Sequence, residues 1–243
     1  MFLEGLAPPG GVLALPETAR RHLGTVLRLG AGAALIGVAP DGTEWDLEWV
    51  GDGRARVLAV RATAPAPEPE TDVTLAVAVP RGERMDWLIE KAVEIGAAAI
   101  LPLLAERSAP AGHVGAGRPA RWERLARAAA EQSGRRRIPP VLPACGLAQA
   151  LAGVAGSRLL AHPGPAGAPG GLALAPRPSG VLIAIGPEGG WSEGEVSAAL
   201  EAGARLLPLG PRILRIETAA LVALTLVLSA LGSLGRTGPE AGA

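Results

Sequence analysis

The chain has 243 residues, of which 49% are apolar, so it is long enough for one large domain or two smaller ones with a sizeable core. Its 23 basic and 23 acidic side chains balance, so no overall field favours nucleic acid or a membrane surface. With one cysteine and three widely spaced histidines, neither an intrachain disulfide nor a metal site of the usual ligand spacing is expected. The N-terminus lacks a basic stretch before an apolar core, so we expect no signal peptide and a cytoplasmic protein.

The first part of the chain predicts a small β-barrel or open sheet. Short runs rich in β-forming residues alternate with turn signals, and Asp41-Gly42 is typical of a hairpin turn between two of them. One helix is expected over residues 17–27. The expected strands span residues 12–15, 33–38, 44–50 and 55–60.

A proline-rich stretch at residues 61–72 has no large apolar residue and predicts a linker. The pattern beyond it changes, because continuous rather than alternating apolar runs indicate strands covered on both faces. Helices between such strands predict a parallel α/β sheet. The expected strands span residues 73–79, 99–103, 158–161, 181–185 and 205–209, and the expected helices span residues 85–95, 119–132 and 192–202, the last opening with a capping box.

The apolar run at residues 219–231 imitates a membrane span, but it is shorter than the ~20 residues that a bilayer needs. A buried helix in a soluble core is the favoured interpretation. The proline- and glycine-rich stretch at residues 163–180 predicts a flexible surface loop, and residues 235–243 predict a flexible tail.

The sequence IGPEGGWSEGEV at residues 185–196 places glycines, a proline and a carboxylate directly after a buried strand. In open parallel sheets, ligands bind beyond the carboxyl ends of the strands, and a helix start with free N–H groups accepts anions. A phosphate cradle is therefore one interpretation, although neither a P-loop nor a GxGxxG motif occurs. Glu188 would repel phosphate, so a cationic or hydrogen-bond-donating ligand fits this loop better.

A second loop, LGPRILRIETA at residues 209–219, also follows a predicted strand and carries Arg212, Arg215 and Glu217 among apolar neighbours. Buried charges are usually paired. An ion pair of Arg215 with Glu217 or with Glu188 is one interpretation. The other is that the two loops line one pocket.

These paired motifs resemble the signature of the bacterial RsmE family of 16S ribosomal RNA methyltransferases, and the resemblance extends from about residue 3 to residue 231. Four further segments resemble the family, at residues 22–28, 81–96, 106–108 and 131–139. The resemblance implies methylation of a uridine at N3, with S-adenosyl-L-methionine as cofactor and the small ribosomal subunit as substrate. It also implies a SPOUT methyltransferase domain with a parallel sheet and a trefoil knot at residues 72–234, a PUA-like RNA-binding β-barrel at residues 1–66, and a homodimer.

The resemblance also implies a cofactor pocket built from three strand ends, in which glycines let the backbone approach the adenine and ribose. The implied cofactor-binding residues are Leu160, Ala161, His162, Ile185, Gly186, Glu188, Gly189, Gly190, Leu209, Gly210, Ile213 and Leu214. The N3 proton of uracil must leave as the methyl group arrives. We expect Arg215 to stabilise the charge that develops on the uracil carbonyls, and Glu188 or Glu217 to act as base or positioning group. Positioning alone is the alternative.

RNA binding needs local cations on this neutral chain. Residues 118–137 hold seven arginines and two glutamates, which favours phosphate binding, although a solvated helix face is the plainer interpretation. The expected RNA-binding residues are Arg21, Arg28, Arg84, Gln132, Arg135, Arg136 and Arg137. His22 is expected to be structural and Cys145 inert, and for His162 contact with the cofactor stays open. A SPOUT enzyme with another RNA target and a non-enzymatic assembly factor are the alternative functions.

Overall fold

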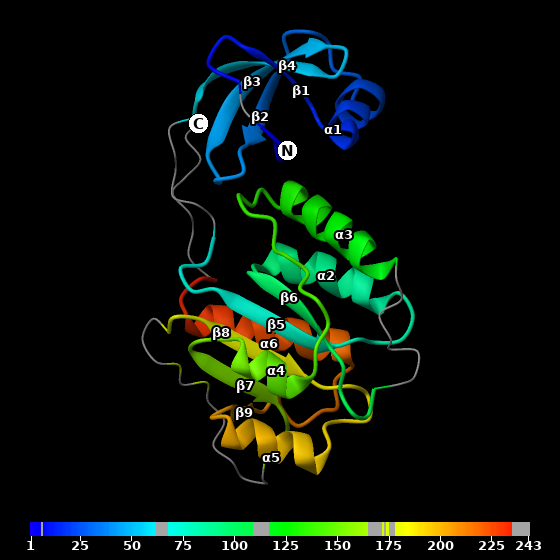
Figure 1. Ribbon diagram of the computed structural model, residues 1–243, viewed down its shortest axis with the longest axis vertical. Coiled ribbons are helices and arrows are strands. Elements are labelled where there is room, and N and C mark those ends of the chain that lie inside the picture. Colours follow the sequence, from blue (N-terminus) through cyan, green and yellow to red (C-terminus); the bar gives the residue numbers. More distant parts are fainter. Residues whose placement is uncertain are drawn as a thin grey trace. The chain divides into compact units, whose positions relative to one another are not determined.

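The computed structural model describes residues 1–5, 7–61, 68–108, 117–164, 172, 174 and 178–234 (Figure 1). The chain divides into two compact units: the first contains Met1–Glu68 and Gly134–Arg137, and the second contains Pro69–Ser133 and Ile138–Thr237. The middle of the predicted linker, most of the predicted loop at residues 163–180 and the predicted tail lie outside the described residues. Within the described residues, no helix combines the length and apolarity needed to cross a bilayer.

The first unit contains a four-stranded antiparallel sheet in the order β1-β4-β3-β2. The predicted hairpin joins β2 to β3, where Gly42 has φ +84° and Asp41 accepts a hydrogen bond from the Thr43 N–H at 2.9 Å. This bond lowers the pKa of Asp41. The strands are β1 (Val12–Ala14), β2 (Ala34–Val38), β3 (Glu44–Gly51) and β4 (Arg54–Val60).

The helix predicted for residues 17–27 is present in two forms. It begins as α1 (Glu17–Arg21) and continues as the π-helical turn η1 (His22–Val26), with Leu23 buried. Leu23 joins a core that the inward faces of the sheet complete with Leu47, Trp49 and Val57. The first unit therefore has an apolar core of its own.

The second unit contains a five-stranded sheet in the order β6-β5-β8-β7-β9, and every pair of neighbours is parallel. This arrangement confirms the predicted parallel α/β sheet. All five residues of β8 are buried, as expected for a strand covered on both faces. The strands are β5 (Val73–Ala78), β6 (Ala99–Leu103), β7 (Ser157–Ala161), β8 (Val181–Ile185) and β9 (Arg205–Leu207).

Helices cover both faces of this sheet: α6 packs on β5, β8 and α2, whereas α4 and α5 enclose a second apolar cluster with the strands (Figure 1). The apolar run at residues 219–231 lies in α6 with Leu224 and Val227 fully buried, which confirms a core helix. The short α4 was not predicted. The helices are α2 (Arg84–Ile95), α3 (Arg118–Gln132), α4 (Leu147–Ala152), α5 (Glu193–Glu201) and α6 (Ile216–Ala230).

Candidate functional site

Five loops leave the carboxyl ends of the parallel strands and share one edge of the sheet. They are residues 79–83 after β5, 104–108 after β6, 162–164 after β7, 186–192 after β8 and 208–215 after β9. Such an edge is the usual ligand site of an open parallel sheet. Because β7 lies between β8 and β9, the loops after these three strands are neighbours.

Two hydrogen bonds connect these three neighbouring loops. The indole Nε1 of Trp191, in the loop after β8, donates to the carbonyl oxygen of Ala161 at the end of β7, at 3.1 Å. The backbone N–H of His162 donates to the carbonyl oxygen of Leu207 at the end of β9, at 3.3 Å. The two sequence motifs are therefore joined through the end of β7.

The glycines of the loop after β8 come close to other parts of the protein. A methyl group added at Gly186 would lie 2.9 Å from Cε2 of Trp191, and one added at Gly189 would lie 3.3 Å from Cβ of Arg107. Gly190 and Gly210 have φ of +70° and +101°, a region that favours glycine. Local packing and backbone conformation thus favour glycine at these four positions, and the approach of the cofactor to their backbone stays a prediction.

Arg107, in the loop after β6, holds the loop after β8 in place. Its Nη1 donates to the carbonyl oxygens of Gly189 at 3.4 Å and Trp191 at 3.1 Å. The adjacent backbone N–H of Glu106 donates to Glu195 of α5 at 3.0 Å. Neither residue was predicted to have a role, because only their match to a family segment marked them.

Glu188 pairs with Arg84, not with Arg215. The Arg84 Nη1 lies 3.5 Å from its Oε1, and both side chains are about half exposed. The interpretation that Arg215 pairs with Glu188 is therefore wrong. An exposed pair of this kind is weak, so the Glu188 carboxylate can still attract a cationic ligand.

Glu217 lies in the first turn of α6, and its Oε2 is buried without a hydrogen-bond donor from any described residue. The alternative interpretation, a pair of Arg215 with Glu217, is therefore also absent from the described structure. A buried carboxylate oxygen without a donor is costly, so a donor supplied by a ligand would stabilise it. Arg215 itself is the exposed N-cap residue of α6.

The side chains of the loop after β9 differ in exposure. Leu209 and Leu214 are half-buried, whereas Ile213 is fully exposed. His162, at the end of β7, accepts a hydrogen bond at Nδ1 from the Gly164 N–H at 3.1 Å. This bond fixes the orientation of the imidazole ring at the end of β7.

The chain resembles known proteins over nearly its whole length. The model of the RNA methyltransferase domain matches residues 67–228. The chain belongs to the RNA methyltransferase family. It is 32% identical over 218 residues to the ribosomal RNA small subunit methyltransferase E of Bacillus subtilis, a match that covers 85% of each chain.

Two solved structures with bound S-adenosylmethionine share the fold of this family member. One is a ribosomal RNA small subunit methyltransferase E from Neisseria gonorrhoeae, with 32% identity, a TM-score of 0.82 and coverage of 94% of this chain and 95% of that one. The other, described as a methyltransferase, is from Legionella pneumophila, with 32% identity, a TM-score of 0.82 and coverage of 94% and 96%.

Two of the expected RNA-binding residues of this RNA methyltransferase are buried. Arg135 and Arg136 are 6% and 8% exposed; Nε of Arg135 lies 3.1 Å from Glu68, and Nε of Arg136 lies 3.0 Å from Glu44. The prediction of an exposed phosphate-binding cluster at residues 135–137 is therefore wrong for these two arginines. The arginine-rich sequence at residues 118–137 does not predict these acidic partners, because they lie 67 and 92 positions away in the sequence.

The remaining expected RNA-binding residues are scattered. Arg21 and Arg28 are exposed in the first unit, and Arg84 pairs with Glu188. On α3, Arg121 pairs with Asp86, which also accepts the indole N–H of Trp122 at 2.9 Å. Part of the arginine run therefore supports packing of α3 on α2.

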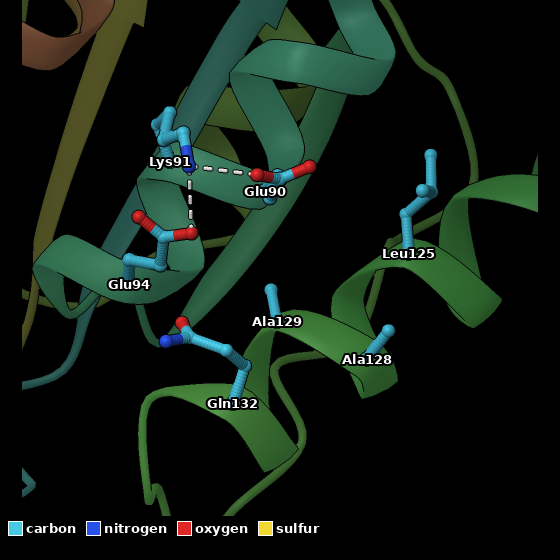
Figure 2. A pocket seen from close by; sticks show the side chains of 7 residues that line it. All are labelled: Glu90, Lys91, Glu94, Leu125, Ala128, Ala129 and Gln132. Atoms are coloured by element: carbon cyan, nitrogen blue, oxygen red, sulfur yellow. Dashed lines mark hydrogen bonds and ion pairs between the residues drawn. The ribbon is translucent and has the colours of Figure 1, made fainter. Parts of the chain in front are cut away.

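A cavity of about 450 Å³ lies between α2 and α3 (Figure 2). Its charges are already paired, because Lys91 donates to Glu90 at 2.7 Å and to Glu94 at 2.8 Å, which raises the Lys91 pKa. Gln132 and three apolar residues of α3, Leu125, Ala128 and Ala129, complete the lining. The cavity borders the second half of α2, whereas the loop after β5 leads into its start, where Arg84 pairs with Glu188. The part of the chain that the structure describes holds no group of three or more potential metal ligands.

Proposed function

We propose that this protein transfers a methyl group from S-adenosyl-L-methionine to N3 of a uridine in the 16S RNA of the small ribosomal subunit. The observation that carries the proposal is the hydrogen-bonded junction of the loops after β7, β8 and β9, at the carboxyl edge of a family-typical sheet. The relatives' names specify small-subunit ribosomal RNA, and two related structures hold S-adenosylmethionine. A ribosomal substrate favours a cytoplasmic location.

The residues at this edge suit the cofactor. The half-buried Leu209 and Leu214 offer apolar contact for an adenine, and backbone groups of residues 160–162 and 185–190 offer hydrogen bonds to its edge and to the ribose. Glu188 offers a half-exposed carboxylate to a ligand that carries a sulfonium and an ammonium group. Bound there, S-adenosylmethionine supplies an activated methyl group.

The roles of the charged side chains follow from their surroundings. The guanidinium of Arg215 has no partner among the described residues, so it is available to stabilise negative charge on a uracil carbonyl. The orphan Oε2 of Glu217 is the better candidate to receive the N3 proton, because Glu188 already pairs with Arg84. Holding uracil in line with the methyl group supplies a further share of the catalysis.

We also propose the larger architecture implied by the resemblance. A SPOUT domain at residues 72–234 with a trefoil knot around the last loop would follow a PUA-like barrel at residues 1–66. A homodimer is supported by apolar side chains left exposed on neighbouring helices, Trp87 on α2 and Leu226 on α6.

Calorimetry and nucleoside mapping test this function together. We expect the purified protein to bind S-adenosylmethionine and to methylate small subunits that lack the modification, with 3-methyluridine found by mass spectrometry. Methylation of another nucleoside would favour a different RNA target. A folded protein with neither cofactor binding nor methyl transfer would overturn the proposal.

A further inference from the structure

Ile213 is the described large apolar side chain with the greatest exposure, at 102%, whereas the others reach at most 64%. It lies in the loop after β9, at the edge proposed to hold the cofactor. Its neighbour Leu214 and the earlier Leu209 are half-buried. The loop thus turns its leucines toward the protein and presents one isoleucine to whatever approaches from solvent.

Two arginines with available charge flank this isoleucine. Arg212 and Arg215 are exposed, and neither guanidinium has an ion pair or hydrogen bond with a described residue. Arg107, by contrast, is engaged by two backbone carbonyls. Unpaired arginines beside an exposed apolar tip are suited to a polyanion that also offers flat apolar faces, which describes an RNA strand.

The reaction itself requires a displaced base. N3 of uracil lies on the Watson–Crick edge, so a stacked and paired uridine cannot present it to a methyl donor. Enzymes that act on such atoms turn the nucleotide out of the stack, at a cost that is smallest when the base is already unpaired. Apolar side chains inserted at a base step can hold such a gap open.

We propose that Ile213 inserts into the gap left by the target uridine, while Arg212 binds an adjacent backbone phosphate. This inference rests on the proposed function and assigns the edge of the loop to a single RNA strand. It also changes the expected role of Ile213, because a side chain that points fully into solvent is less suited than Leu209 and Leu214 to contact the cofactor.

Ile213→Ala tests the insertion, with Leu200→Ala on α5 as a matched control because Leu200 is also exposed, at 47%. We expect Ile213→Ala to lower kcat/KM for unmodified small subunits about 10- to 100-fold, as the loss of a contact that offsets base displacement implies. Affinity for S-adenosylmethionine and the sedimentation coefficient should not change. The Ile213→Leu variant, which keeps a large apolar side chain, should retain most of the wild-type activity.

A second measurement reports the gap directly. An RNA fragment with 2-aminopurine next to the mapped uridine should become more fluorescent when the wild-type protein binds, and much less so with Ile213→Ala. Placing an abasic site opposite the target should reduce the difference between the two proteins, because the base is then already free. Arg212→Gln should lower the slope of log Kd against log salt by about one, as expected for one lost phosphate contact.

The outcomes separate the alternatives. Weaker cofactor binding by Ile213→Ala would mean that Ile213 contacts the cofactor, and dissociation of a dimer would mean that a second copy covers it; either result overturns the inference. Activity of Ile213→Ala equal to that of Leu200→Ala would overturn it as well. A wild-type protein that neither binds the cofactor nor methylates RNA would instead remove the proposed function.

Discussion

The indole of Trp191 fills the space beside Gly186 and donates its Nε1 hydrogen to the carbonyl oxygen of Ala161 at 3.1 Å. One side chain thus shapes the loop after β8 and fixes it to the end of β7. We predict that Gly186→Ala displaces this ring, because the added methyl group would lie 2.9 Å from Cε2. Overpacking of this kind costs about 1–3 kcal/mol, and the displaced loop should also lower affinity for S-adenosylmethionine.

Gly194→Ala is the matched control, because its added methyl group would lie 3.7 Å from the Ser192 hydroxyl, in ordinary contact. Denaturant unfolding and cofactor titration should show little change for this variant or slight stabilisation of α5. Equal stability and equal cofactor affinity of both variants would contradict the importance of the contact between Gly186 and Trp191.

At the level of single residues, local patterns predicted where the chain leaves a strand, but they did not predict which side chains meet there. The glycine-rich corner at residues 186–190 follows a strand as predicted, yet Gly186 faces Trp191 and Gly189 faces Arg107. Glu188 was expected to contact the cofactor or to act as base, and its partner in the structure is Arg84. The contacts between side chains of different loops depend on strand order and on side-chain rotamers. The spacing of residues along the sequence determines neither.

Among the elements, the start of α5 joins helix capping to loop geometry. Ser192 and Glu195 form the predicted capping box: the Ser192 hydroxyl accepts the Glu195 N–H at 3.0 Å, and Glu195 Oε2 accepts the Ser192 N–H at 2.9 Å. The other oxygen of Glu195 accepts the Glu106 N–H at 3.0 Å. One carboxylate therefore caps the helix and holds the loop after β6.

We predict different effects for the two halves of this box. Ser192→Ala should lower the free energy of unfolding by about 0.5–2 kcal/mol through loss of the cap alone. Glu195→Ala should cost more and should also increase hydrogen exchange at the Glu106 amide, which Ser192→Ala leaves protected. Similar exchange at Glu106 in both variants would show that Glu195 does not hold the loop.

Periodicity and turn chemistry were sufficient to predict the long elements. The apolar spacing of α2, the proline near the start of α3 and the capping box of α5 are all local signals, and each helix lies where it was expected. The helix α4 was not predicted, because its six residues span fewer than two turns and are too few for a periodic apolar pattern. The π-helical end at residues 22–26, where Leu23 is buried, was not predicted either.

For the whole molecule, the class of each half was predictable but the composition of the units was not. Alternating and continuous apolar runs separated an antiparallel sheet from a parallel one. The order β6-β5-β8-β7-β9 depends on long-range pairing, and so does the membership of Gly134–Arg137 in the first unit. Local patterns do not encode either property, because the partners lie far apart along the chain.

The ion pairs of that short segment lead to a prediction for the first unit. Glu68 and Arg135 are 9% and 6% exposed, and the Glu68 carboxylate also accepts the backbone N–H groups of Arg136 and Arg137 at 3.0 and 3.2 Å. Removing Glu68 takes away the carboxylate that pairs with the buried Arg135 guanidinium. Glu68→Ala should therefore destabilise the first unit by about 3–5 kcal/mol.

Glu48→Ala is the control, since its pair with Arg56 is partly exposed and should contribute about 0–1 kcal/mol. Hydrogen exchange measured by mass spectrometry separates the effects on the two units. With Glu68→Ala, peptides from β2, β3 and β4 should lose protection while those from β5 and β8 keep it, because the second sheet has its own core. Cofactor affinity should then persist while methylation of small subunits falls, whereas equal loss of protection in both sheets would mean that the units unfold as one.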